Sequence, residues 1–181
     1  VELDDEELTA GEDGKYTIPG SKINGTALTV TITATAPAYT IAVSKYMDVD
    51  AKTMYLITAS GNVGEGKVLN YGESKMYWSE KYSAYAWLVI SDKTLDEVED
   101  EAAAAVKLAD GEKTNIDYTG DVNLTGVTDI NDAQLVWNMY KVDYKDDFVT
   151  VNVQKYLTAD VNGDRVLNTN DAVVIVNGLV G

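Results

Sequence analysis

An internal repeat near the C-terminal end of the sequence limits the possible folds more than any other feature. Residues 121–133 (DVNLTGVTDINDA) align with residues 160–172 (DVNGDRVLNTNDA), a spacing of 39 positions. Over the first 18 aligned positions, eight residues are identical. They include positions 1, 3, 7 and 12 of a twelve-residue loop. EF-hand loops supply calcium ligands from these positions.

The residue types in both copies suit a hard cation. Ca²⁺ takes six to eight oxygen ligands, which an EF-hand loop offers from side chains at positions 1, 3 and 5, a carbonyl at 7, position 9 and a bidentate carboxylate at 12. We therefore expect two bound Ca²⁺ ions. The expected ligands are Asp121, Asn123, Thr125, the carbonyl of Val127, Asp129 and Asp132 in the first loop, and Asp160, Asn162, Asp164, the carbonyl of Val166, Asn168 and Asp171 in the second.

Both loops depart from the EF-hand pattern. They end in Asp rather than Glu, and the shorter side chain must approach the metal more closely to stay bidentate. Gly126 occupies the turn position 6 of the first loop, whereas Arg165 occupies it in the second, where a positive φ is costly. Gly163 at position 4 is expected to relax that turn. Solvated acidic turns without metal are the alternative interpretation.

Composition narrows the chemistry further. The chain has no His and no Cys, which excludes Ser-His-Asp and Cys-His catalysis, thiolate redox chemistry and ordinary zinc, haem or iron–sulfur ligation. Its 181 residues carry 30 Asp and Glu against 14 Lys and Arg, a formal net charge of −16. That charge argues against a nucleic-acid partner. No apolar stretch approaches the roughly 20 residues that cross a bilayer, so we expect no membrane partner.

Apolar spacing predicts a helix after each loop, over residues 133–140 and 172–178, and a short third helix within 147–157. The segment 115–120 is too short and polar for an entering helix. Each repeat, 121–142 and 160–181, is thus a loop followed by one helix. We place this all-α domain at residues 113–181.

Residues 14–112 have the texture of an antiparallel β-sandwich, and the acidic residues 1–13 are interpreted as a leader or linker. Alternating or β-rich segments predict strands at 27–33, 39–43, 53–58, 67–71, 75–78 and 84–90. Thr94 and Glu97 match a capping box for a short helix that ends before Gly111. Residues 106–108 could instead form a last strand, and 111–119 read as a linker. Because the chain begins at Val1, we interpret it as a piece of a longer protein.

Paired loop–helix calcium repeats that open with Asp-Val-Asn and close with Asn-Asp-Ala resemble the type I dockerin modules of cellulosomal and amylosomal bacteria, with a Ruminococcus-like pairing of modules. The resemblance covers residues 115–181. It implies a secreted, non-catalytic module that binds the cohesin module of a scaffoldin in an extracellular polysaccharide-degrading complex and is monomeric when unbound. The preceding β-domain is similar to X-modules or immunoglobulin-like modules.

The resemblance also implies a partner surface at loop positions 10 and 11 and along the following helix. In this sequence those positions hold Ile130, Asn131, Trp137, Asn138 and Val142 in the first repeat, and Thr169, Asn170, Val176 and Asn177 in the second. Two other function classes stay open. One is a carbohydrate-binding β-module that stacks sugars on Tyr77, Trp78, Tyr82, Tyr85 and Trp87. The other is a glycoside hydrolase with two catalytic carboxylates, for which the chain leaves little room.

Overall fold

The computed structural model describes residues 2–3, 6–7, 18, 30–31, 38–141 and 153–180. The chain divides into two compact units, Val1–Ala36 and Pro37–Gly181. In the first unit, β1 (Glu2–Leu3) pairs with β2 (Glu6–Glu7) and with β3 (Val30–Thr31). Strand residues therefore occur within the acidic leader. Of the strand predicted at 27–33, only β3 lies within the described residues.

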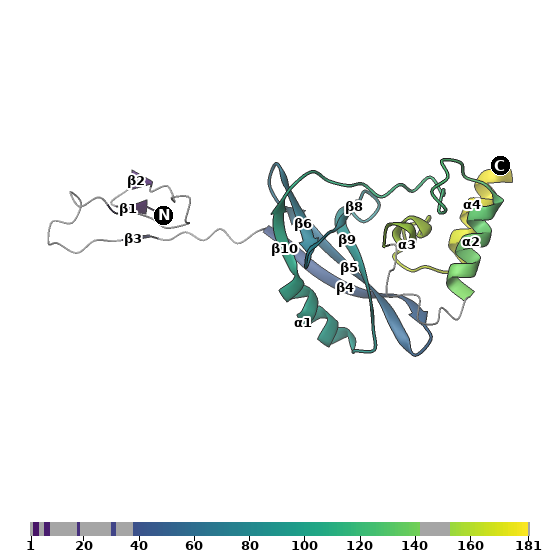
Figure 1. The fold of residues 1–181 in the computed structure, drawn as a ribbon, viewed down its shortest axis with the longest axis horizontal. Coiled ribbons are helices and arrows are strands. Elements are labelled where there is room, and N and C mark those ends of the chain that lie inside the picture. Colours follow the sequence, from purple (N-terminus) through teal and green to yellow (C-terminus); the bar gives the residue numbers. More distant parts are fainter. Residues whose placement is uncertain are drawn as a thin grey trace. The chain divides into compact units, whose positions relative to one another are not determined.

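The second unit contains two antiparallel sheets (Figure 1). The larger sheet has the order β4-β5-β9-β8, formed by β4 (Ala38–Val49), β5 (Lys52–Asn62), β9 (Ala84–Ser91) and β8 (Tyr77–Ser79). The smaller sheet has the order β10-β6-β7, formed by β10 (Val106–Asp110), β6 (Lys67–Tyr71) and β7 (Ser74–Lys75). Strands predicted at 39–43, 53–58, 67–71 and 84–90 are confirmed.

The single strand predicted at 75–78 is wrong. The chain crosses from the smaller to the larger sheet at Met76, which belongs to neither sheet and has no exposed surface. The Met76 backbone N–H donates to the carbonyl of Leu69 at 2.9 Å. The segment divides into β7 and β8 at Met76 because the chain passes there from β6 of the smaller sheet to β9 of the larger one, and the Met76 side chain lies in the core that the two sheets share.

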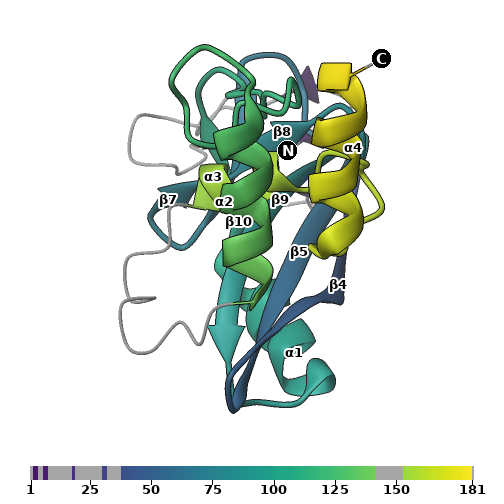
Figure 2. The same ribbon diagram turned by 90° about the vertical axis from the view of Figure 1, so that its right-hand side faces the viewer.

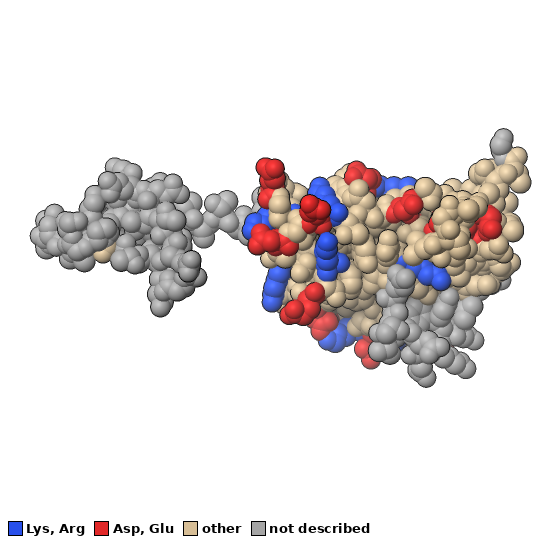
Figure 3. Space-filling view, turned by 45° about the horizontal axis from the view of Figure 1, so that its top comes forward, with Lys and Arg blue, Asp and Glu red and all other residues tan. Residues whose placement is uncertain are grey.

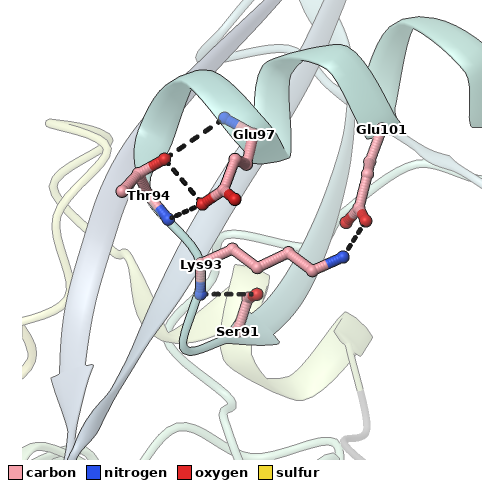
Figure 4. A network of polar contacts seen from close by, with 5 residues as sticks. All are labelled: Ser91, Lys93, Thr94, Glu97 and Glu101. Atoms are coloured by element: carbon pink, nitrogen blue, oxygen red, sulfur yellow. Dashed lines mark hydrogen bonds and ion pairs between the residues drawn. The ribbon is translucent and has the colours of Figure 1, made fainter.

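Helix α1 (Leu95–Ala105) begins at the predicted capping box. The Thr94 hydroxyl accepts from the Glu97 N–H at 3.5 Å, and the Glu97 carboxylate accepts from the Thr94 N–H at 2.9 Å (Figure 4). Nearby, Lys93 forms an ion pair with Glu101. The helix ends at Ala105 and β10 starts directly at Val106, so the predicted helix and the alternative last strand are both present.

The larger sheet is buried on both faces. On one face, Ile57 and Tyr85 share a core with Leu69 of β6, Val98 of α1 and Val106 of β10. On the other face, the sheet packs against the C-terminal helices. That second core contains Met54, Leu56, Ala86 and Leu88 from the sheet and Val136, Met139, Leu157 and Ile175 from the helices. Strand β5 is accordingly buried without a break from Met54 to Ala59.

The C-terminal helices are α2 (Ile130–Lys141), α3 (Val153–Ala159) and α4 (Thr169–Val180). Helices α2 and α4 pack together side by side, and α3 lies between this pair and the larger sheet (Figures 1 and 2). The helices predicted at 133–140 and 172–178 are confirmed, and each begins three residues earlier. Of the third helix predicted within 147–157, residues 147–152 lie outside the described residues, and residues 153–157 lie in α3. No helix of the described residues is long and apolar enough to cross a bilayer.

Candidate calcium loops and the groove beside them

The two predicted calcium loops are called the first loop (121–132) and the second loop (160–171). The same pattern of hydrogen bonds occurs in both. In the first loop, the carboxylate of Asp121 accepts from the backbone N–H groups of Thr125 at 2.9 Å and Gly126 at 2.6 Å. In the second loop, the carboxylate of Asp160 accepts from those of Asp164 at 3.1 Å and Arg165 at 2.9 Å. Position 1 therefore holds the amides of positions 5 and 6 in both copies.

Position 12 closes each loop in the same repeated manner. Asp132 accepts from the N–H groups of Asn123 and Asp129, both at 2.9 Å, through its two different oxygens. Asp171 accepts from those of Asn162 at 3.3 Å and Asn168 at 3.0 Å, again with one bond for each oxygen. An ionised carboxylate has about four lone-pair sites. Each oxygen at position 12 thus keeps acceptor capacity, as a bidentate metal ligand requires.

Positions 3 and 9 complete the repeated network. The side-chain oxygen of Asn123 accepts from the Thr125 N–H at 3.0 Å, and that of Asn162 accepts from the Asp164 N–H at 2.8 Å. At position 9, Asp129 and Asn168 accept from the N–H groups of Asn131 and Asn170, at 2.7 and 2.8 Å. Because α2 and α4 begin at the next residue, position 9 also satisfies a free amide at the start of each helix.

The carboxylates at positions 1 and 12 are buried in both loops. Asp132, Asp160 and Asp171 have no exposed surface, and Asp121 is 9% exposed. Desolvation by burial raises the pKa of Asp160, against the opposing effect of the hydrogen bond from Tyr82, and raises the pKa of Asp171 to about 6. The ion pairs Lys45–Asp48, Lys67–Asp110 and Lys93–Glu101 join exposed side chains away from these carboxylates.

The donor set of each loop is mixed. Within the described part of the chain, no three Asp, Glu, His or Cys side chains gather in an arrangement able to hold a metal ion on their own. Each loop instead combines two buried carboxylates with amide, hydroxyl or backbone oxygens; for example, the Thr125 hydroxyl lies 3.4 Å from the Val127 carbonyl. Calcium accepts such a mixture, whereas His- and Cys-seeking metals do not. The residues present therefore fit Ca²⁺.

Between α2 and α4 lies an apolar groove of about 280 Å³. Four of the predicted partner residues line it: Ile130, Trp137, Thr169 and Val176. Ile130 is 62% exposed and Trp137 is 41% exposed. Asn131, Asn138, Asn170 and Asn177 are exposed but do not line the groove, and Val142 lies outside the described residues.

The groove is itself a product of the repeat. Its lining consists of four pairs that are each separated by 39 residues: Ile130 with Thr169, Ala133 with Ala172, Gln134 with Val173, and Trp137 with Val176. The second and third pairs were not predicted from the sequence, although they follow position 10 at the i+3 and i+4 spacing of one helix face. Around this end of the second unit, the surface is largely uncharged on the face shown in Figure 3.

The five aromatic residues considered for sugar binding do not form one exposed platform. Tyr82 and Tyr85 are buried, at 4% and 1% exposed, while Tyr77, Trp78 and Trp87 are half-buried. Trp87 stacks on Tyr77 with the ring centroids 6.3 Å apart.

Comparison with family models, curated proteins and solved structures finds no match. Interpretation of the site therefore depends on its geometry and on the repeat.

Several contacts around the second loop were not predicted from the sequence. The Tyr82 hydroxyl, from the turn between β8 and β9, donates to Oδ2 of Asp160. Tyr46 donates from its hydroxyl to the carbonyl of Tyr156 at 2.7 Å, and its own carbonyl accepts from the Leu167 N–H at 3.1 Å. These partners are separated by 78 to 121 positions, and no periodicity in the sequence marks them.

Proposed function

We propose that this chain is a calcium-dependent docking module that binds the cohesin module of a scaffoldin and so anchors its parent protein in a secreted bacterial complex that degrades polysaccharides. In this proposal residues 113–181 are a dockerin with two EF-hand-like calcium loops, and residues 14–112 are an X-module or immunoglobulin-like sandwich. The module is not an enzyme and is monomeric when unbound.

The observation that carries the proposal is the duplicated network on Asp121 and Asp132 and on Asp160 and Asp171. Two copies of a solvated turn have no reason to bury both terminal carboxylates with the same amide donors. A bound calcium ion would explain this burial, because its positive charge offsets the desolvation and the mutual repulsion of the carboxylates around it. The groove between α2 and α4 supplies an exposed apolar surface beside these loops, as protein partners require.

A carbohydrate-binding β-module is the second candidate, favoured by the half-buried stack of Trp87 with Tyr77 and with Tyr71 at 6.2 Å. It is the weaker candidate, because Tyr82 and Tyr85 have no surface to offer a sugar ring.

The deciding experiment is a pull-down of the full chain against a panel of cohesins and against insoluble starch and cellulose, each with calcium and with chelator. The docking proposal expects capture by at least one cohesin in calcium and none in chelator. Calcium-independent capture by a polysaccharide, with no cohesin retained, would replace it with the second candidate.

A further inference from the structure

The turn between β8 and β9, residues 80–83, lies directly against the second loop. The Tyr82 hydroxyl donates to Oδ2 of Asp160, and the Lys81 ammonium donates to the carbonyl of Val161. In the other direction, Nη2 of Arg165 donates to the Tyr82 carbonyl at 3.4 Å. Both Tyr82 and Asp160 are buried, at 4% and 0% exposed, so water does not compete for the bond between them.

Strand β4 extends this contact. A β-bulge shifts the register between Lys45 and Met47, and Tyr46 lies at the shift, fully buried in the core shared with the helices. The Tyr46 carbonyl accepts from Leu167 at 3.1 Å. Positions 1, 2 and 6 of the second loop are thus hydrogen-bonded to the β8–β9 turn, and position 8 is hydrogen-bonded to strand β4.

The first loop has a different environment. Among the described residues, and apart from the backbone bonds within α2, its hydrogen bonds run to residues 119–132, within the loop and the short segment before it. Oδ2 of Asp121 accepts from Gly126 at 2.6 Å, whereas Oδ2 of Asp160 accepts both from Arg165 and from the Tyr82 hydroxyl. Oδ1 of Asp160 also accepts from the loop amides of Gly163 at 2.8 Å and Asp164 at 3.1 Å, whereas the Tyr82 hydroxyl is a donor from outside the loop. This donor further restricts the rotation of the Asp160 carboxylate before any cation arrives. Such preorganisation strengthens binding because less freedom is lost when the ligand is bound.

We propose that Tyr82 is a positioning residue for the second calcium loop: by holding Oδ2 of Asp160 it raises the calcium affinity of that loop alone. By reciprocity, calcium bound there stabilises the β8–β9 turn. The inference rests on the proposed calcium binding, and it makes the two repeats unequal, with the second one joined to the β-sheet.

The test measures calcium affinity by calorimetric titration in two backgrounds of the full chain. Asp132→Asn leaves the second loop intact, and Asp171→Asn leaves the first. Adding Tyr82→Phe keeps the ring and removes only the hydroxyl. Because a hydrogen bond to a charged group is lost, we expect about tenfold or more weaker binding in the Asp132→Asn background and no change in the Asp171→Asn background.

Tyr85→Phe is the matched control. Tyr85 is another buried tyrosine of the same sheet, whose hydroxyl donates to the Lys67 carbonyl at 3.3 Å, away from both loops. It should change neither affinity. Unchanged second-loop affinity in Tyr82→Phe, or equal losses in both loops, would overturn the inference while leaving calcium binding intact. Absence of calcium binding by the unsubstituted protein would overturn the proposed function as well.

A second measurement does not depend on the stability of the Tyr82 variant. In the unsubstituted chain, the N–H group of Tyr82 donates to Oγ of Ser79 and that of Ser83 to the carbonyl of Glu80. Amide hydrogen exchange at both residues should slow when calcium is added. The slowing should persist in Asp132→Asn and disappear in Asp171→Asn. Exchange that ignores calcium, or that responds equally in the two variants, would overturn the coupling.

Discussion

Positions 4 and 6 of both loops have left-handed backbone, and the two repeats place glycine at opposite positions. In the first loop Leu124 has φ 60° and Gly126 has φ 88°; in the second loop Gly163 has φ 74° and Arg165 has φ 72°. Each loop therefore carries one strained non-glycine residue. The strain predicted for Arg165 is present, and Gly163 does not remove it.

Leu124→Gly should stabilise the protein by about 0.5–1 kcal/mol, because a left-handed leucine costs about 1–2 kcal/mol and the gain is partly offset by the entropy of glycine in the unfolded chain. Leu124 is 45% exposed, so little packing is lost. Leu108→Gly is the control, since Leu108 is 41% exposed and lies in the ordinary strand backbone of β10. This substitution should destabilise the protein. Denaturant unfolding measures both. A similar loss for the two substitutions would contradict the expectation.

Among the helices, α1 offers the sharpest local test, because sequence alone predicted its capping box. Thr94→Ala removes the hydroxyl acceptor and should cost about 1 kcal/mol of unfolding free energy. Glu97→Gln keeps a carbonyl oxygen that can accept from the Thr94 N–H, so it should cost clearly less. Equal losses in chemical denaturation would contradict this expectation, since they would show that the charge of Glu97 contributes as much as the Thr94 hydroxyl.

Helices α2 and α4 present unequal residues to the groove. Trp137→Ala should weaken cohesin binding by about 2 kcal/mol or more, roughly thirtyfold, because an aromatic anchor at an interface is costly to truncate. Val176→Ala removes less apolar area and should matter less. Affinity is measured in calcium, with bound calcium checked in both variants. Equal losses would indicate two interchangeable binding modes, and a loss only for Val176→Ala would assign the anchor to the second repeat.

Local patterns predicted most of these elements. Alternation located β4, β6 and β9, the capping box located α1, and the repeat located α2 and α4. The division of 75–78 between two sheets was not predictable, since it depends on the tertiary packing around the buried Met76 side chain. The predicted start of α2 and of α4 lies three residues too far along the chain. Asp129 and Asn168 were considered only as metal ligands, whereas their side chains also accept from backbone N–H groups in the first turn of each helix.

In the second unit as a whole, the larger sheet joins two cores, and sequence analysis did not anticipate this. The apolar run from Met54 to Ile57 does indicate a strand that is covered on both faces, since such strands lack the alternation of apolar and polar residues. Pairs such as Tyr46 with Tyr156 and Tyr82 with Asp160 carried none, because nothing local in a sequence marks a contact between distant residues. The predicted boundary between 112 and 113 stays a prediction, while both cores lie within the unit Pro37–Gly181.

Calcium stoichiometry tests the central claim most directly. Calorimetric titration of the chelator-treated full chain should report two bound Ca²⁺ ions, because each loop ends in a buried carboxylate, Asp132 or Asp171, whose two oxygens both keep acceptor capacity. Asp132→Asn and Asp171→Asn are a matched pair at the 39-residue spacing, and each should leave one ion bound. A stoichiometry of zero for the unsubstituted chain, or two ions retained by both variants, would contradict the account.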